Sequence, residues 1–297
     1  MKTLRLTLTC ILLTFVAALP AMAGPRTFVS GLGNDANPGT REQPKRTFAS
    51  ALTVTDPGGE VVVLDPAGFG SSTLLINKSV SIIVPGGIFG GIRVDTGNAI
   101  TVAAGSNDTV VLRGLTLNSG GGTNGIEFQS GAALHVENCI INGFTNGYGI
   151  FVPPGAGGLA RLFVKDTICR RNFTGVRCEA GRASLDHVRL EQNANTALSA
   201  VSGSKVSIAN SVASGNTTGL HSSGSAGELN IEACLVANTV FSGILSQSGA
   251  TVRVSNSTVT NNGTGLNNNS TLVSRLNNTV QGNTANKNGT IGSFAAD

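Results

Sequence analysis

Along most of the chain, apolar and polar residues alternate in short runs, which is the pattern of strands that bury one face. In residues 125–129, for example, Ile126 and Phe128 alternate with polar side chains. Two further short apolar runs follow at 134–137 and 139–141. Because later stretches repeat this order between Gly- and Asn-rich turns, we predict units of three short strands.

The three-strand unit recurs with a nearly constant period. A small residue followed by an aliphatic one marks most recurrences, and successive pairs lie 22 to 26 residues apart. The pairs in this column are Thr73-Leu74, Ala99-Ile100, Gly125-Ile126, Gly149-Ile150, Gly175-Val176, Ala197-Leu198, Gly219-Leu220, Gly243-Ile244 and Gly265-Leu266. A period in the low twenties is typical of a solenoid. We therefore expect eight to nine coils around one aliphatic interior.

Polar residues also recur in register, at two turns of the repeat. One column follows the second strand and holds Asn138, Asp166, His187, Asn210, Asn256 and Asn278. The other stands where repeats join and holds Asn172, Asn216 and Asn262. Asn tolerates left-handed turns, and its amide can bond the equivalent amide of a neighbouring coil. We expect both columns to satisfy turn backbone.

The pattern of the first 23 residues predicts that the protein is exported. Lys2 and Arg5 precede an apolar run at 6–19 and the small residues 21–23, which is the pattern of a signal peptide cleaved near Ala23. We find no second apolar run of spanning length, so we expect no membrane span. The mature product would be secreted, in the periplasm or the extracellular space.

Composition narrows the class of protein further. Only 12% of the 297 residues are charged, against roughly 25% in ordinary soluble domains. Because Gly, Asn, Ser, Thr and Val dominate, the composition disfavours a helical bundle and an α/β cofactor enzyme. Without Lys2 and Arg5 there are 18 basic and 16 acidic residues, a net charge of +2, which is too weak to predict nucleic-acid binding. We expect a monomer without a cofactor.

The start of the mature chain carries a second motif. It reads Phe28-Val29-Ser30, then Gly33-Asn34-Asp35-Ala36-Asn37-Pro38-Gly39-Thr40, then Pro44 and Thr47-Phe48. Together with the repeat, this resembles the right-handed parallel β-helix proteins of the pectate-lyase-like superfamily, and the opening of many secreted bacterial β-helix proteins. The resemblance covers residues 27 to about 285. Lys45-Arg46 departs from it, because an apolar residue usually follows the proline.

The resemblance implies an all-β fold, a right-handed single-stranded parallel β-helix with a short N-terminal capping helix at about 47–54. We expect one domain over 24–297, with a cap over about 24–60, coils over about 61–282 and a tail over 283–297. The superfamily includes lyases, hydrolases, epimerases and adhesins, so the fold does not decide the function.

The resemblance also directs attention to possible catalytic residues. Lyases of the superfamily use calcium bound by Asp or Glu and an Arg or Lys base, so an enzyme of this type would need calcium. The outward column of the first strand is Glu127, Phe151, Arg177, Ser199, His221, Leu245 and Asn267. Arg177 and Glu179 share this face with Glu127 two rungs away, which gives a candidate base and two candidate acids. The alternative is a surface ion pair. We find no zinc spacing, and no metal site is predicted.

Basic and aromatic residues crowd the stretch from 144 to 189, where residues 153–158 also lengthen one coil. The candidate substrate-binding residues are Tyr148, Phe151, Arg161, Arg170, Arg171, Arg177 and His221. Such a surface would suit an acidic polysaccharide. The alternative is that the Phe side chains fill the core and the Arg side chains solubilise a sheet. The absence of Trp counts against a sugar-stacking platform.

Two further patterns concern the interior and the second strand. Cys139, Cys169, Cys178 and Cys234 all fall at inward positions, where a thiol acts as a small hydrophobe. Cys169 and Cys178 lie on consecutive turns, so either a disulfide bond or free thiols are possible. The second strand's outward column is Glu137, Lys165, Asp186, Ala209 and Glu232, in which we expect a charge ladder that supports register.

Three functions follow from these patterns. The first is a secreted, non-catalytic protein that contacts acidic polysaccharide through a basic and aromatic sheet face. The second is a polysaccharide lyase, hydrolase or epimerase that uses Arg177, Glu127 and Glu179. The third is a structural or adhesive module that binds protein. Short loops and the lack of converging acids favour the first.

Overall fold

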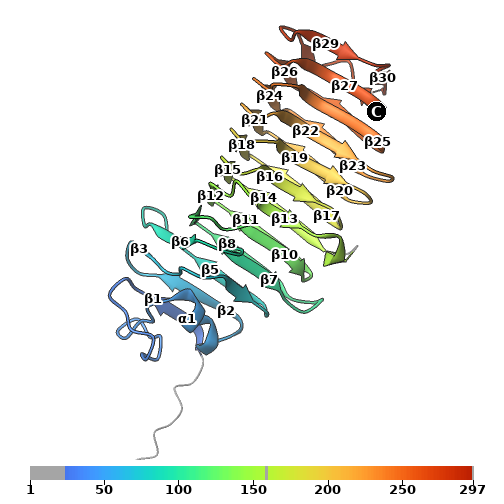
Figure 1. Ribbon diagram of the computed structural model, residues 1–297. Coiled ribbons are helices and arrows are strands. Elements are labelled where there is room, and N and C mark those ends of the chain that lie inside the picture. Colours follow the sequence, from blue (N-terminus) through green and yellow to red (C-terminus); the bar gives the residue numbers. More distant parts are fainter. Residues whose placement is uncertain (1–23, 158–159, 296–297) are drawn as a thin grey trace, which may run out of the picture.

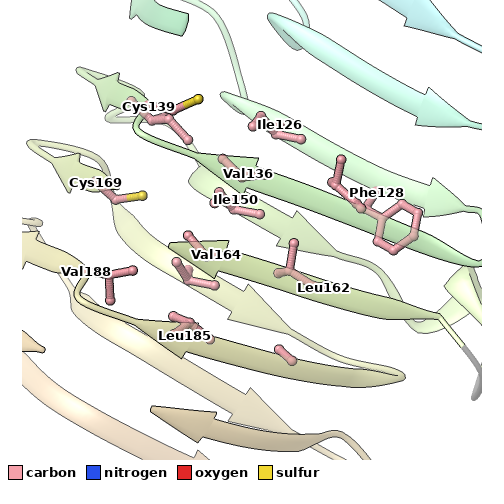
Figure 2. Packing of buried hydrophobic residues seen from close by; sticks show 14 of the residues in the cluster. Ile126, Phe128, Val136, Cys139, Ile150, Leu162, Val164, Cys169, Leu185 and Val188 are labelled. Carbon is pink, nitrogen blue, oxygen red and sulfur yellow. The ribbon is translucent and has the colours of Figure 1, made fainter. Parts of the chain in front are cut away.

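The computed structural model describes residues 24–157 and 160–295 (Figure 1). The predicted signal peptide, residues 1–23, lies outside these residues. The described chain winds into an elongated parallel β-helix whose coils stack from the N-terminal to the C-terminal end. Its interior is a continuous apolar column, and Figure 2 shows inward side chains such as Ile126, Val136 and Leu162, which come from different strands. Burial of each such side chain contributes roughly 1.5–3 kcal/mol to folding.

The first face carries the strands that begin at or next to the small-aliphatic pairs, together with one further strand at the C-terminal end. They are β4 (Leu74–Ile76), β7 (Ile100–Ala103), β10 (Ile126–Ser130), β13 (Tyr148–Val152), β16 (Thr174–Cys178), β19 (Thr196–Val201), β22 (Thr218–Ser223), the first halves of β25 (Ser242–Ser255) and β27 (Thr264–Ser274), and β29 (Ala285–Asn288). The predicted column from Glu127 to Asn267 is confirmed, since each member pairs with the next in register.

The second face carries the strands that come next along the chain in each coil. Its strands are β1 (Gly24–Val29), β2 (Thr55–Val63), β5 (Val80–Ile83), β8 (Thr109–Arg113), β11 (Ala133–Glu137), β14 (Arg161–Lys165), β17 (Arg182–Asp186), β20 (Lys205–Ala209), β23 (Glu228–Glu232), the second halves of β25 and β27, and β30 (Gly292–Ser293). Because β25 and β27 run unbroken from the first face into the second, the two faces join as one 20-stranded sheet in the described chain.

The third face is a separate sheet of ten strands in the described chain. They are β3 (Ala67–Gly68), β6 (Gly90–Val94), β9 (Leu115–Ser119), β12 (Ile140–Asn142), β15 (Ile168–Arg170), β18 (Arg189–Glu191), β21 (Val212–Ser214), β24 (Leu235–Ala237), β26 (Thr258–Thr260) and β28 (Thr279–Val280). One strand per coil gives ten coils rather than eight to nine. The solenoid also continues past residue 282, because β29 and β30 pair with β27. The sequence there lacks apolar alternation, since both strands are largely exposed.

The N-terminal motif builds the cap. Helix α1 (Phe48–Val54) begins after Thr47, whose Oγ1 accepts a hydrogen bond from the Ser50 N–H. Partial burial acts to raise the pKa of Asp35, but hydrogen bonds from Thr47 and from the Arg46 N–H outweigh it and hold that pKa below its usual value. Lys45 is buried and its Nζ donates to the Asp35 carbonyl at 2.8 Å, which explains why a lysine stands at the position of an apolar residue. In the described residues no helix is long and apolar enough to cross a membrane.

Buried asparagines form a ladder at the corner between the third and first faces. The Oδ1 of Asn193 accepts from the N–H and Nδ2 of Asn172, and the Oδ1 of Asn216 accepts in the same way from Asn193, at 2.9–3.2 Å. A second ladder joins Asn262 to Asn283. The predicted join column is therefore a hydrogen-bonded ladder. The sequence pattern missed Asn193, because a Thr rather than a Gly follows it three residues later.

The other polar column lies at the corner after the second face. Asn138, Asp166, His187, Asn210 and Asn256 all adopt left-handed conformations, with φ between 47° and 52°. The prediction for the last member was wrong by one residue. The pairing of β26 with β28 aligns Asn256 with Asn277, whose Nδ2 donates to it at 2.8 Å, while Asn278 accepts from the Ser257 N–H.

All four cysteines in the described chain are free and buried. The disulfide bond considered between Cys169 and Cys178 is not formed. Cys169 is the middle residue of β15 on the third face, and Cys178 is the last residue of β16 on the first face. Four residues of strand, roughly 13 Å, separate Cys178 from the start of β16, and a disulfide needs Cα atoms within about 7 Å. Burial raises the pKa of Cys139 and Cys178 to about 12 and that of Cys234 to about 11.

Candidate functional site

The structure brings two of the three predicted catalytic residues together. The Nε and Nη2 of Arg177 both lie 2.5 Å from Oε1 of Glu179. Glu127 is not part of this pair, because the Phe151 rung lies between it and Arg177. The carboxylate of Glu127 instead accepts from Asn98 at 2.5 Å and from Gln129 at 3.1 Å. Arg177 is therefore held by one carboxylate, and the three residues do not converge on one point.

Other predicted binding residues surround Arg177, and with Glu179 they form what we term the first-face cluster: Tyr148, Phe151, Arg177, Glu179 and His221. The Tyr148 ring lies 4.6 Å from that of Phe151, and the Arg177 guanidinium is 5.6 Å from the Tyr148 ring. The Nε2 of His221 is 3.1 Å from the side-chain oxygen of Gln247. Burial lowers the pKa of His221, which keeps it neutral at pH 7. The polar members of the cluster thus find partners on the same face.

The remaining predicted binding residues lie on other faces. Arg161 begins β14 on the second face, whereas Arg170 ends β15 on the third face. Arg171 stands at the next corner in a left-handed conformation with φ 54°. Phe144, in the same stretch of sequence, is fully buried. The basic and aromatic stretch therefore does not form one patch, because each coil turns three corners and distributes neighbouring residues over different faces.

A shallow groove runs along the second face. Three adjoining hollows of about 200, 370 and 580 Å³ share Ser184 and extend over β11, β14, β17, β20, β23 and β25. These strands lie side by side through the middle of the solenoid in Figure 1. At one rung every ~4.8 Å, the six strands span roughly 24 Å. The groove is thus an elongated site rather than a closed pocket.

Three columns of outward residues build the groove. Because the strands pair in register, each column places one side chain per rung. The floor is His135, Phe163, Ser184, Ser207, Asn230 and Arg253. The basic rim is Arg161, Arg182 and Lys205, and Glu228 follows it on the next rung. The mixed rim is Glu137, Lys165, Asp186, Ala209 and Glu232, whose predicted register is confirmed.

The two ends of the groove differ in charge. At the C-terminal end, Glu228 lies 3.1 Å from Lys205 and 3.3 Å from Arg253, and the hydrogen bond from Lys205 is the main cause that lowers the pKa of Glu228. At the N-terminal end, no acidic side chain of the described residues lies within ion-pair distance of Arg161 or Arg182. Both are exposed and stand on adjacent rungs. Like charges on adjacent strands repel, so this end favours a bound anion.

The N-terminal end of the floor is aromatic. The Phe163 side chain is exposed, and its ring stacks on His135 with centroids 4.7 Å apart and an interplanar angle of 16°. Ser184, one rung further along, is also exposed. An exposed ring beside hydroxyl groups and two arginines offers the mixture of apolar and polar contacts that a charged sugar needs.

Two carboxylates of the mixed rim, those of Asp186 and Glu232, have lowered pKa values. The pKa of Asp186 is lowered chiefly by a hydrogen bond from Asn210, and that of Glu232 chiefly by one from Ser255. A general acid would need a raised pKa instead. Over residues 24–157 and 160–295, no three His, Cys, Asp or Glu side chains gather as a metal centre requires.

Comparison with known proteins agrees with this architecture. A family model described as "Right handed beta helix region" matches residues 98–285. The chain belongs to this right-handed β-helix family. Among solved structures, the β-helix resembles pectate lyase Pel9A with a TM-score of 0.70 and 17% identity, over 89% of this chain and 78% of that one. At this identity the likeness shows the fold alone.

Two further solved structures match this β-helix less closely. They are the A-modules of the mannuronan C-5 epimerases AlgE6 and AlgE4 of Azotobacter vinelandii, with TM-scores of 0.39 and 0.40 and 13% and 12% identity. Each match covers 80% of this chain, and 89% and 91% of the two modules respectively. A search of curated proteins finds no match.

Of the residues in this groove, the sequence pattern selected Arg161 as a binding candidate, and Phe163 and Arg182 fall within the basic and aromatic stretch from 144 to 189. Lys205, Ser184 and Ser207 were not predicted to belong to a site. The signal that finds them is the register: reading the first outward position of the second strand down successive coils gives Arg161, Arg182 and Lys205 in line. The groove is built from residues that lie side by side across coils, not from a cluster along the chain.

Proposed function

We propose that this β-helix protein binds an acidic polysaccharide in the second-face groove without cleaving it. The observation that carries the proposal is the pair of exposed arginines, Arg161 and Arg182, on adjacent rungs without acidic partners among the described residues. The fold resemblance to a protein named as a pectate lyase agrees with an acidic polymer as the ligand. Export by the predicted signal peptide would bring the groove to such polymers.

Each part of the groove has a role in this binding. The guanidinium groups of Arg161 and Arg182 would hold carboxylates of the polymer by charge-assisted hydrogen bonds. Phe163 would lie against the apolar face of a sugar ring. Ser184, Ser207 and Asn230 would exchange hydrogen bonds with its hydroxyl groups. The open ends of the groove would let a long chain pass through.

A catalytic role is the second candidate, and the Pel9A resemblance is what favours it. A lyase, hydrolase or epimerase that used Arg177 as the base would have to release it from Glu179, and Glu127 would act from a separate network. The geometry of the first face therefore argues against catalysis there, and binding in the second-face groove is the better supported function.

The test is calorimetric titration of the mature protein with polygalacturonate at pH 7.5 and low salt. Fully methyl-esterified pectin is the matched ligand control, because it keeps the polymer and loses the charge. We expect binding to polygalacturonate that weakens with salt and is absent for the ester. The Arg161→Ala/Arg182→Ala double variant should bind about tenfold more weakly, since two exposed ion pairs are lost.

The matched control variant is Arg189→Ala, because Arg189 is exposed on the third face and already pairs with Glu191 at 2.6 Å. It should bind like the wild type. Alginate serves as a second acidic polymer. Absence of binding to both polymers would overturn the proposal and favour capture of a protein. Shortened chains after incubation with calcium would establish the enzymatic alternative.

A further inference from the structure

His135 stands at the N-terminal end of the groove floor, in the middle outward position of β11. Its half-buried ring stacks on Phe163 of β14, the next rung, with centroids 4.7 Å apart. Phe163 therefore supports one face of the imidazole. The same hollow is lined by Glu137 on the same strand and by Lys165 and Asp186 on the following rungs. His135 is thus a histidine inside the proposed binding site.

The other two histidines of the chain lie elsewhere. His221 belongs to the first-face cluster rather than to the groove, and burial lowers its pKa. His187 stands at the corner after β17, where its Nδ1 lies 2.9 Å from Asp186. Only His135 contributes its ring directly to the groove floor.

The fixed charges around His135 come from its own strand and from the strands on either side. They are Arg113 on β8, Glu137 on β11, Arg161 and Lys165 on β14, and Asp186 on β17. Arg113 pairs with Glu137 at 2.7 Å. Three of these five groups are basic and two are acidic. A proton on His135 therefore raises the local charge from +1 to +2.

We propose that His135 is a pH-dependent contact of the groove, whose protonated ring binds a carboxylate of the polysaccharide while resting on Phe163. This rests on the function proposed above. The imidazolium has two N–H donors and a full charge. The face of Phe163 stabilises a cation placed over it. The carboxylates of the polymer stay ionised in this range, so lower pH strengthens binding rather than weakening it.

The linkage between proton binding and ligand binding determines whether affinity for the polysaccharide rises or falls with pH. A ligand that binds the protonated form better is bound more tightly below the histidine pKa, which is ordinarily about 6.5. Since the contact is partly exposed, we expect polygalacturonate to bind about threefold to fivefold more tightly at pH 5.5 than at pH 7.5, the size of one such ion pair.

The experiment repeats the polygalacturonate titration at pH 5.5, 6.5 and 7.5 at constant ionic strength. The wild type should show the pH effect, and His135→Gln should lose it, so that the affinity of the variant is the same at pH 5.5 as at pH 7.5. His221→Gln and His187→Gln are the matched controls and should keep the effect. A pH effect that persists in His135→Gln, or a wild type whose affinity is independent of pH, would overturn this inference alone.

An NMR titration of the His135 ring in the wild-type protein provides a readout that does not depend on any variant. Its midpoint should move to higher pH when polygalacturonate is added. A midpoint unchanged by bound polymer would overturn the inference. Absence of binding at every pH would overturn the proposed function together with it, so the two failures are distinguishable.

Discussion

The first-face cluster and the second-face groove lie on adjoining faces of the same coils, and they differ in how their charges are balanced. In the cluster, Arg177 places two nitrogens on Glu179, and the result is a local ion pair. In the groove, Arg161 and Arg182 stand on adjacent rungs and face solvent. Both faces contain arginine and aromatic rings, so composition does not separate them. The difference shows that in this solenoid a candidate anion site is recognised by basic side chains on adjacent coils that have no acidic partner among the described residues.

The largest expected effect concerns the ladder on which both faces rest. The Asn216→Ala variant removes an oxygen that accepts two hydrogen bonds from Asn193 and an amide that donates to the Leu190 carbonyl. Because buried partners are left unsatisfied, we expect the free energy of unfolding to fall by about 4 kcal/mol in chemical denaturation.

The matched substitution is Asn210→Ala in the exposed corner column. Asn210 donates to Asp186 and has φ 49°, so its loss should lower the unfolding free energy by only about 1 kcal/mol. If Asn216→Ala and Asn210→Ala lowered the free energy of unfolding equally, the buried ladder would not contribute more to stability than the exposed column.

The next test makes the C-terminal end of the groove resemble its N-terminal end. The Glu228→Gln variant releases Lys205 and Arg253 from their shared carboxylate. We expect polygalacturonate to bind about threefold more tightly at low salt and nearly unchanged at high salt, since the released charges are exposed. Calorimetry at two salt concentrations measures this. Weaker binding by the variant would mean that Glu228 itself contacts the ligand.

A smaller effect is expected on the first face. The Arg177→Gln variant should lower the unfolding free energy by about 0.5–1 kcal/mol, because the ion pair with Glu179 is partly exposed. Its affinity for polygalacturonate should stay within about twofold of the wild type by the same scale of exposed ion pairs. Loss of binding in this variant would move the site from the groove to the first-face cluster.

The cysteines in the interior shared by both faces should not react with a thiol reagent in the folded protein. Since burial raises the pKa of Cys139 and Cys178 to about 12, native protein at pH 8 should not react with a thiol reagent. After unfolding of the mature protein in denaturant without reductant, all four cysteines of residues 24–295 should react. A pair of cysteines that reacted only after reduction would contradict the free thiols of the structure.

Much of the fold could be predicted from the sequence. Stacked coils place similar residues at equivalent positions, so the repeat appears in the sequence as a regular period. The first-face column from Glu127 to Asn267 and the helix after Thr47 both follow from local pattern. The pattern failed where two asparagines stand together, at Asn277 and Asn278, since either can fill one place in a column. Only the main-chain register decides between them.

The candidate site was predicted far less well. Arg161, Arg170 and Arg177 lie close together in sequence, yet the structure puts them on the second, third and first faces. Lys205 lies more than forty residues from Arg161 and still shares its rim. Which charges are paired depends on side-chain geometry, such as the reach of Glu228 to both Lys205 and Arg253. A linear sequence does not contain that information.

The asparagine ladder makes the length of the groove adjustable. Residues 194–216 carry one complete coil, from the residue after Asn193 to the next ladder member, and with it the β20 rung. Excision of these residues would join Asn193 to an equivalent position and shorten the groove by one step of roughly 4.8 Å. Duplication of a coil would lengthen it by the same increment. The length of the groove can therefore change only in whole steps, by insertion or deletion of complete coils.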